Sequence, residues 1–274
     1  MKYRAVIFDL WQTLVPWPTE SAERMYAELA ETWGADPETL LEVWARRRRE
    51  REIGPIEPHL RSIAEELGLS GDLEAVITMR REWTARSIVP RDDAVSTLEE
   101  LRRRGHLLGM ISACTAEVPE VWEQTRFGGL FDSTVFSSSV GVSKPDPRIY
   151  EIACEELGVL AGDCLFVGDG ANDELPGAER AGMTALQLRP PGERLTPEGE
   201  RWQGRYVGRL SDVLELARPF GLVEAEKREE AVGGLPITGH VEQLGLNRVP
   251  RRDLPRSDAE ERRWVGFDDR VGLA

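Results

Sequence analysis

Residues 5–14 read AVIFDLWQTL, and this stretch decides the fold. Residues 5–8 form a short apolar run with β-branched and aromatic side chains, and Asp9 follows directly. Such a run predicts a buried strand that delivers an acid to the edge of a sheet. Ligands of open α/β sheets bind outside the carboxyl ends of the strands, so Asp9 is a candidate nucleophile, metal ligand or both. The alternative is that Asp9 only caps a turn.

Further strand-like runs follow along the chain, and helical patterns separate most of them. These runs cover residues 107–111, 134–137, 164–168 and 184–188. Asp146-Pro147 is a good helix start, and Gly158 follows the expected end of the same helix. Strands that alternate with helices predict an α/β fold, here a Rossmann-like, doubly wound and mainly parallel sheet with right-handed crossovers.

The first crossover is far longer than a single helix requires. About 95 residues separate the first two strands, and Pro16 and Pro90 interrupt the chain at either end of this segment. We therefore predict an inserted all-helical cap domain at residues 16–89, with two hinges through which it opens and closes over a site. Helical periodicity covers residues 19–33, 37–52, 59–67 and 73–87. The arginine run 46–49 is expected to be a solvated helix face.

The remaining residues divide into a core and an extension. Residues 1–15 and 90–222 are expected to form the α/β core. Residues 223–274 lose clear periodicity and contain scattered prolines and glycines, so we expect an irregular C-terminal extension, whose role the sequence leaves open.

Composition limits the class of partner. A net charge of −14 argues against nucleic acid, although an acidic protein still binds phosphate where a cation offsets the repulsion. No apolar run approaches the roughly 20 residues needed to span a membrane. An odd, sparse set of three cysteines and a start without a signal-peptide pattern predict a cytoplasmic protein. The oligomeric state is left open.

Polar side chains also come directly after other predicted strands, at the strand ends where a ligand site is expected. Ser112 follows the run 107–111, and Asp169 follows the run 164–168. Lys144 lies in a loop that leads into a helix, and it is one of only three lysines in a chain that otherwise uses arginine. Together with Asp9 and Thr13, this ordered set resembles the haloacid dehalogenase-like (HAD) hydrolase superfamily, in particular the subgroup with a helical cap inserted after the first motif. The resemblance covers about residues 3–220.

The resemblance implies a Mg²⁺-dependent phosphatase that acts on a small phosphorylated metabolite. Asp9 would be the nucleophile that forms an aspartyl-phosphate, and Lys144 would neutralise charge beside it. Thr13 and Ser112 would hold phosphate oxygens. The metal would be bound by Asp9, by the backbone carbonyl at Trp11, by Asp169, and by Asp173 as second ligand or orienting acid. Asn172 is a candidate substrate contact, with a plain turn residue as the alternative.

The sequence departs from the family at Trp11. HAD phosphatases normally carry a second aspartate there, which protonates the leaving group and later activates water. Gln12 also replaces the usual glycine. The substrate would then have a good leaving group or bring its own acid, or Glu174 or a cap residue would supply the proton.

The sequence leaves two other functions open. A dehalogenase-like hydrolase would attack carbon through an aspartyl ester, and such enzymes carry an aromatic residue at the Trp11 position but lack the Gly-Asp metal segment. A slow or non-catalytic protein would keep only the phosphate pocket. Schiff-base chemistry from the cap is excluded because residues 16–89 contain no lysine. The cap has no readable ligand motif, so the substrate is open too.

Overall fold

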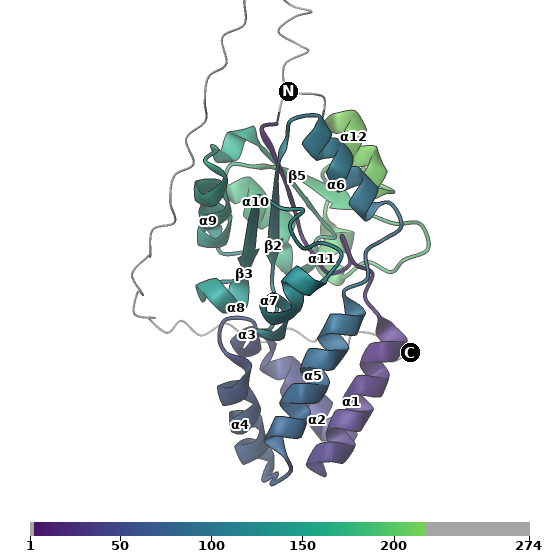
Figure 1. Cartoon of the computed structure of the whole chain (residues 1–274), viewed down its shortest axis with the longest axis vertical. Helices are drawn as coiled ribbons and strands as arrows, with labels where there is room; N and C mark the ends of the chain where they lie inside the picture. Colours follow the sequence, from purple (N-terminus) through teal and green to yellow (C-terminus); the bar gives the residue numbers. More distant parts are fainter. Residues whose placement is uncertain (1–2, 218–274) are drawn as a thin grey trace, which may run out of the picture. The chain divides into compact units, whose positions relative to one another are not determined.

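The computed structural model describes residues 3–217, and their centre is one parallel sheet (Figure 1). Its strands run in the order β3-β2-β1-β4-β5-β6, and all neighbouring pairs are parallel. Their bounds are β1 Ala5–Phe8, β2 Leu107–Ser112, β3 Ser133–Phe136, β4 Cys164–Gly168, β5 Thr184–Leu188 and β6 Tyr206–Val207. All five predicted strands are confirmed to within a residue at either end. β6 was not predicted because a two-residue strand has no readable periodicity.

Helices cover both faces of the sheet, as the alternating side chains of β1 require. Val6 and Phe8 belong to a hydrophobic cluster with α6 (Ala94–Arg103) and α12 (Val213–Leu216). Ala5 and Ile7 belong to a second cluster with α9 (Pro147–Leu157) and α10 (Glu174–Arg180). Figure 1 shows these two helix pairs on opposite sides of the sheet. The doubly wound, Rossmann-like α/β fold is thereby confirmed.

The register of the central strands brings the predicted polar residues to one edge. Phe8 lies opposite Met110 of β2 and Val167 of β4. The backbone N–H of Asp9 continues this ladder and donates to the carbonyl of Val167 at 2.9 Å. Asp9, the end of β2 and the end of β4 therefore meet at the carboxyl edge of the sheet.

The segment between β1 and α6 is mostly helical. It comprises α1 Thr19–Trp33, α2 Pro37–Arg46, α3 Arg48–Arg51, α4 Ile56–Leu67 and α5 Leu73–Ser87. Helices α1, α2, α4 and α5 share a hydrophobic cluster of their own around Leu29, Leu60 and Ile63. The helix expected over residues 37–52 is broken at Arg47, where the backbone leaves the helical conformation at φ −97° and ψ 14°. The division into core, cap and extension stays a prediction.

Shorter elements complete the described chain. They are α7 Glu117–Val121, η1 Trp122–Gln124, α8 Ser137–Val140, η2 Ala161–Asp163, η3 Ala171–Asp173, α11 Pro197–Arg201 and η4 Leu210–Asp212. The extension predicted at residues 223–274 lies outside the described residues. Within residues 3–217, no helix combines the length and apolar character that crossing a membrane requires.

Candidate active site

A buried lysine joins two carboxylates at the carboxyl edge of the sheet. Lys144 Nζ donates to Asp9 Oδ1, to Glu174 Oε2 at 2.6 Å and to the carbonyl of Ile111 at 3.2 Å. Burial by itself would lower the pKa of Lys144, but the charges of Asp9 and Glu174 outweigh it and raise the pKa above its ordinary value. Lys144 is therefore a permanent ammonium group held against Asp9.

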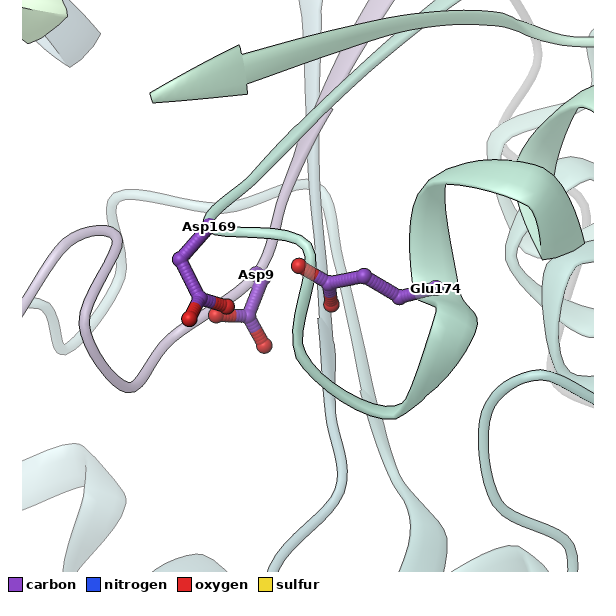
Figure 2. A group of neighbouring side chains, drawn as sticks. All are labelled: Asp9, Asp169 and Glu174. Atoms are coloured by element: carbon purple, nitrogen blue, oxygen red, sulfur yellow. The ribbon is translucent and has the colours of Figure 1, made fainter. Parts of the chain in front are cut away.

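Three buried carboxylates face one another around this lysine. One oxygen each of Asp9, Asp169 and Glu174 lie within 4.8 Å of one another, and Figure 2 shows the carboxylates turned together. They come from the end of β1, the end of β4 and the first residue of α10. Burial, and then the charge of Asp9, raise the pKa of Asp169 to about 6 and raise that of Glu174 well above its ordinary value.

This carboxylate group fits a divalent cation. Three carboxylates share one ammonium, so the group carries an excess of negative charge when all are ionised. Asp169 Oδ1 accepts from the backbone N–H of Ala171 at 3.2 Å, while its buried Oδ2 has no hydrogen-bond partner among the described residues. Carboxylate oxygens are the ligands that Mg²⁺ prefers, and a buried unpaired carboxylate oxygen needs a cation or a donor.

Thr13 and Ser112 bring two buried hydroxyl groups close to the ends of β1 and β2. Both side chains are fully buried, at 0% exposure. Neither hydroxyl has a hydrogen-bond partner among residues 3–217. Ser112 ends β2, and Thr13 lies in the tight loop that follows Asp9. Buried hydroxyls without a protein partner are available to a ligand.

Trp11 connects the loop after Asp9 to the inserted helices. Its ring packs edge-on against Trp17 at a centroid distance of 5.4 Å, and Trp17 packs against Trp83 of α5 at 6.1 Å. The next residue, Gln12, has a φ of 61°, a left-handed conformation that suits the glycine it replaces. Position 11, where HAD phosphatases normally carry a second aspartate, thus holds an aromatic side chain that contacts the inserted segment.

Asn172 and Asp173 are not brought into the carboxylate group. Both adopt left-handed backbone conformations, at φ 56° and 52°. The Asp173 side chain is 56% exposed and lies 3.6 Å from Arg201. These two left-handed residues turn the chain so that the following residue, Glu174, points inward. The sequence analysis considered Glu174 only as a possible proton source and did not predict its contact with Lys144. The two adjacent acids, Asp173 and Glu174, were the signal from which this contact could have been suspected.

Comparisons with known proteins agree with this geometry. A family model described as haloacid dehalogenase-like hydrolase matches residues 3–182. The glyceraldehyde 3-phosphate phosphatase of Methanopyrus kandleri is 28% identical over 197 residues, which are 68% of this chain and 84% of that protein. The (S)-2-haloacid dehalogenase 4A of Burkholderia cepacia is 32% identical over 101 residues, which are 36% of this chain and 43% of that protein.

A solved structure has a fold similar to that of this chain. The crystal structure of a HAD phosphatase from Thermococcus onnurineus matches with a TM-score of 0.61 and 23% identity. The match covers 80% of this chain and 100% of that chain. At this identity the match speaks for the fold alone.

Proposed function

Because the chain belongs to the haloacid dehalogenase-like hydrolase family, we propose that this hydrolase is a Mg²⁺-dependent phosphatase of a small phosphorylated metabolite. The observation that carries the proposal is the facing pair of buried carboxylates, Asp9 and Asp169, with Asp169 Oδ2 lacking a protein partner. Attack on carbon needs one nucleophilic carboxylate and its lysine. A second buried carboxylate beside them adds negative charge at a buried site, and a bound cation offsets that charge.

Each residue of the group has a role in phosphoryl transfer. Asp9 attacks phosphorus and forms an aspartyl-phosphate, which water then hydrolyses. Lys144 neutralises negative charge between Asp9 and the phosphate. The unpartnered hydroxyls of Thr13 and Ser112 donate to phosphate oxygens. Catalysis of this kind depends mainly on positioning and charge neutralisation, which a buried, preorganised group supplies.

The residues proposed to hold Mg²⁺ are Asp9, Asp169 and the backbone carbonyl of Trp11. When bound, the cation neutralises charge on the transferring phosphoryl group. We assign the second acid of this motif to Glu174 rather than to Asp173, because Glu174 contacts Lys144 at 2.6 Å while Asp173 lies near Arg201. Glu174 then orients the ammonium of Lys144 toward Asp9.

Trp11 restricts the substrate that such a site turns over. General acid–base help contributes about 10²–10⁴ in rate, and the aromatic side chain of Trp11 supplies none. A substrate with a good leaving group, such as an acyl phosphate, or one that carries its own acid needs no such help. We keep the expectation of a small cytoplasmic metabolite as the substrate.

The experiment measures phosphate release from a panel of phosphorylated metabolites that includes aryl and acyl phosphates. Wild type and Asp9→Asn are compared, each with Mg²⁺ and with EDTA. We expect turnover that requires Mg²⁺ and is lost in Asp9→Asn. Absence of turnover on every phosphate would overturn the proposal.

The second candidate is a dehalogenase-like hydrolase, and the aromatic residue at position 11 favours it. In that reaction Asp9 would attack carbon and displace halide, and the aspartyl ester would then be hydrolysed. Release of chloride from 2-chloro acids, unaffected by EDTA, would establish it. Phosphate binding without turnover of either substrate class would instead mark a slow or non-catalytic protein.

A further inference from the structure

Four charged side chains contain a buried polar atom without a hydrogen-bond partner among the described residues. One is Asp169 in the candidate active site; the others are Arg51 Nε, Arg80 Nη1 and Glu117 Oε2. Similar unpartnered groups at Trp33, Ser87 and Thr97 are uncharged. A buried charged group without a full set of partners is costly and calls for an explanation. Arg51, Arg80 and Glu117 are called here the arginine cluster.

Arg51 is the unusual member of the arginine cluster. It is 5% exposed, and none of the described carboxylates lies within ion-pair distance of it. Its guanidinium donates to the carbonyl of Trp44 and lies over the Trp44 ring at 4.2 Å. The neighbouring acid, Glu52, pairs with Arg48 at 2.7 Å instead. Burial lowers the pKa of Arg51 to about 9, which still leaves it charged near neutral pH.

Arg80 of α5 adds a second guanidinium on the same ring. It lies 4.7 Å from the Trp44 centroid, and its Nε donates to Glu117 of α7. Glu117 is fully buried, and the charge of Arg80 lowers its pKa against the opposing effect of burial. Arg80 is therefore neutralised by Glu117, while Arg51 is not. The arginine cluster carries one net positive charge, and two of its nitrogens, Arg51 Nε and Arg80 Nη1, have no hydrogen-bond partner in the part of the chain that the structure describes.

One contact connects the arginine cluster to a loop of the candidate active site, and a residue close to Arg51 in the chain lies near a second loop. Arg80 Nη2 lies 3.5 Å from Thr115 Oγ1, three residues after Ser112. The carbonyl of Ile53, two residues after Arg51, lies 4.0 Å from where a Cβ would sit on Gly141, three residues before Lys144. The cluster thus adjoins the loop that follows Ser112, and the chain just after Arg51 approaches the loop that leads to Lys144.

We propose that Arg51 and Arg80 bind a second anionic group of the substrate, distinct from the phosphate that is transferred. The inference rests on the proposed phosphatase function and narrows it to phosphomonoesters that carry a carboxylate or a further phosphate. The two unpartnered nitrogens supply N–H donors for anionic oxygens, and the net charge of the cluster is neutralised by one negative charge. The unpartnered Glu117 oxygen is available to a hydroxyl or ammonium group of the same ligand.

The test uses matched substrates of graded length. One series consists of phosphomonoesters of ω-hydroxy acids with two to six carbons, and the second consists of alkyl phosphates of the same lengths. A third series replaces the carboxylate with a second phosphate. We expect wild type to prefer one anionic series at one length, with kcat/KM about 10- to 100-fold above that of the alkyl phosphate. The preferred series identifies the anion.

Arg51→Gln is expected to remove this preference and leave kcat/KM for alkyl phosphates within about twofold. Arg51→Lys, which keeps a positive charge, should retain part of the preference. Arg61→Gln is the matched control and should change neither series, because Arg61 lies on the exposed surface of α4 and pairs with Glu57. Equal loss on anionic and alkyl phosphates in Arg51→Gln would overturn the proposal, as would a wild type without any preference.

A binding measurement separates this inference from the phosphatase proposal. In Asp9→Asn protein, the preferred anionic phosphate should raise the melting temperature, and adding Arg51→Gln should abolish the rise relative to the alkyl phosphate. If no phosphate is turned over but this dependence on Arg51 is found, the anion site stands and the phosphatase proposal fails. If turnover is found without any dependence on Arg51 in either assay, the anion site fails alone.

Discussion

Arg91 Nε donates to the carbonyl oxygen of Thr13 at 2.8 Å, and this bond joins the chain just after Pro90 to the loop after Asp9. The same guanidinium donates to the carbonyl of Gln12 at 2.8 Å. It also forms a two-point ion pair with Glu193 in the loop after β5. Arg91 therefore fixes the position of the loop after Asp9 relative to the chain after Pro90 and the loop after β5.

Arg91→Gln is expected to lower kcat about 10-fold or more, because the loop after Asp9 loses two bonds that fix its position. It should also lower the free energy of unfolding by about 1–3 kcal/mol, since both carbonyls lose a charged donor. Urea unfolding and steady-state kinetics measure the two effects. The control is Glu193→Gln, which keeps both carbonyl bonds and removes only a partly exposed ion pair. Equal effects of the two variants would show that the carbonyl bonds do not matter.

Glu174→Gln and Asp173→Asn decide which of the two adjacent acids serves the site. Glu174 is 1% exposed and contacts Lys144, whereas Asp173 is exposed beside Arg201. We expect kcat/KM to fall about 10- to 100-fold in Glu174→Gln, because Lys144 loses one of the carboxylates that orient it. Asp173→Asn should stay within about twofold. A larger loss of kcat/KM in Asp173→Asn than in Glu174→Gln would show that Asp173 is the acid of this motif.

The stability of metal-free protein should depend on pH through Asp169. Its folded pKa is raised to about 6, above the ordinary value of 3.8, so the folded state holds this proton more tightly than the unfolded state. The contribution of Asp169 to stability is present below about pH 4 and is lost as pH rises through 6. At pH 8 metal-free Asp169→Asn should be more stable than wild type, by up to about 3 kcal/mol.

Magnesium is expected to reverse this difference in stability between wild type and Asp169→Asn. Mg²⁺ should raise the melting temperature of wild type at pH 8, where Asp169 is ionised, and should raise it less at pH 5. Asp169→Asn should show little Mg²⁺-dependent rise at either pH. Thermal melts with Mg²⁺ and with EDTA measure this directly. An equal rise in both proteins would place the cation elsewhere.

The fold was predictable because its signals are local. The continuous apolar run of β1 is typical of a strand buried on both faces. Helix α9 begins and ends at its predicted residues because Asp146 caps its first turn and Gly158 ends it at φ 64°. The meeting of Asp9, Ser112 and Asp169 then follows from the parallel register. β6 has only two residues, and its pairing to β5 through Leu188 and Val207 leaves no pattern in the sequence.

The rest of the site depends on angles and contacts that the sequence does not encode locally. Whether Asp173 or Glu174 turns inward is decided by the left-handed backbone of Asn172 and Asp173. Arg51 follows a run of arginines that predicts a solvated helix face. It is nevertheless buried, and its guanidinium packs on the ring of Trp44. The anchoring of the Asp9 loop by Arg91 joins residues about 80 positions apart.

Trp11→Asp is expected to restore the missing general acid. An aspartate there would stand two residues after the nucleophile, where it can protonate a leaving group, and such help contributes about 10²–10⁴ in rate. The gain should therefore be large for alkyl phosphates, which have poor leaving groups, and small for aryl or acyl phosphates. Trp11→Asn is the matched control, because it removes the contact with Trp17 without supplying a proton. Phosphate release across leaving groups of graded pKa measures the effect. Equal rates in Trp11→Asp and Trp11→Asn would mean that Trp11 acts through substrate shape and not through the absence of an acid.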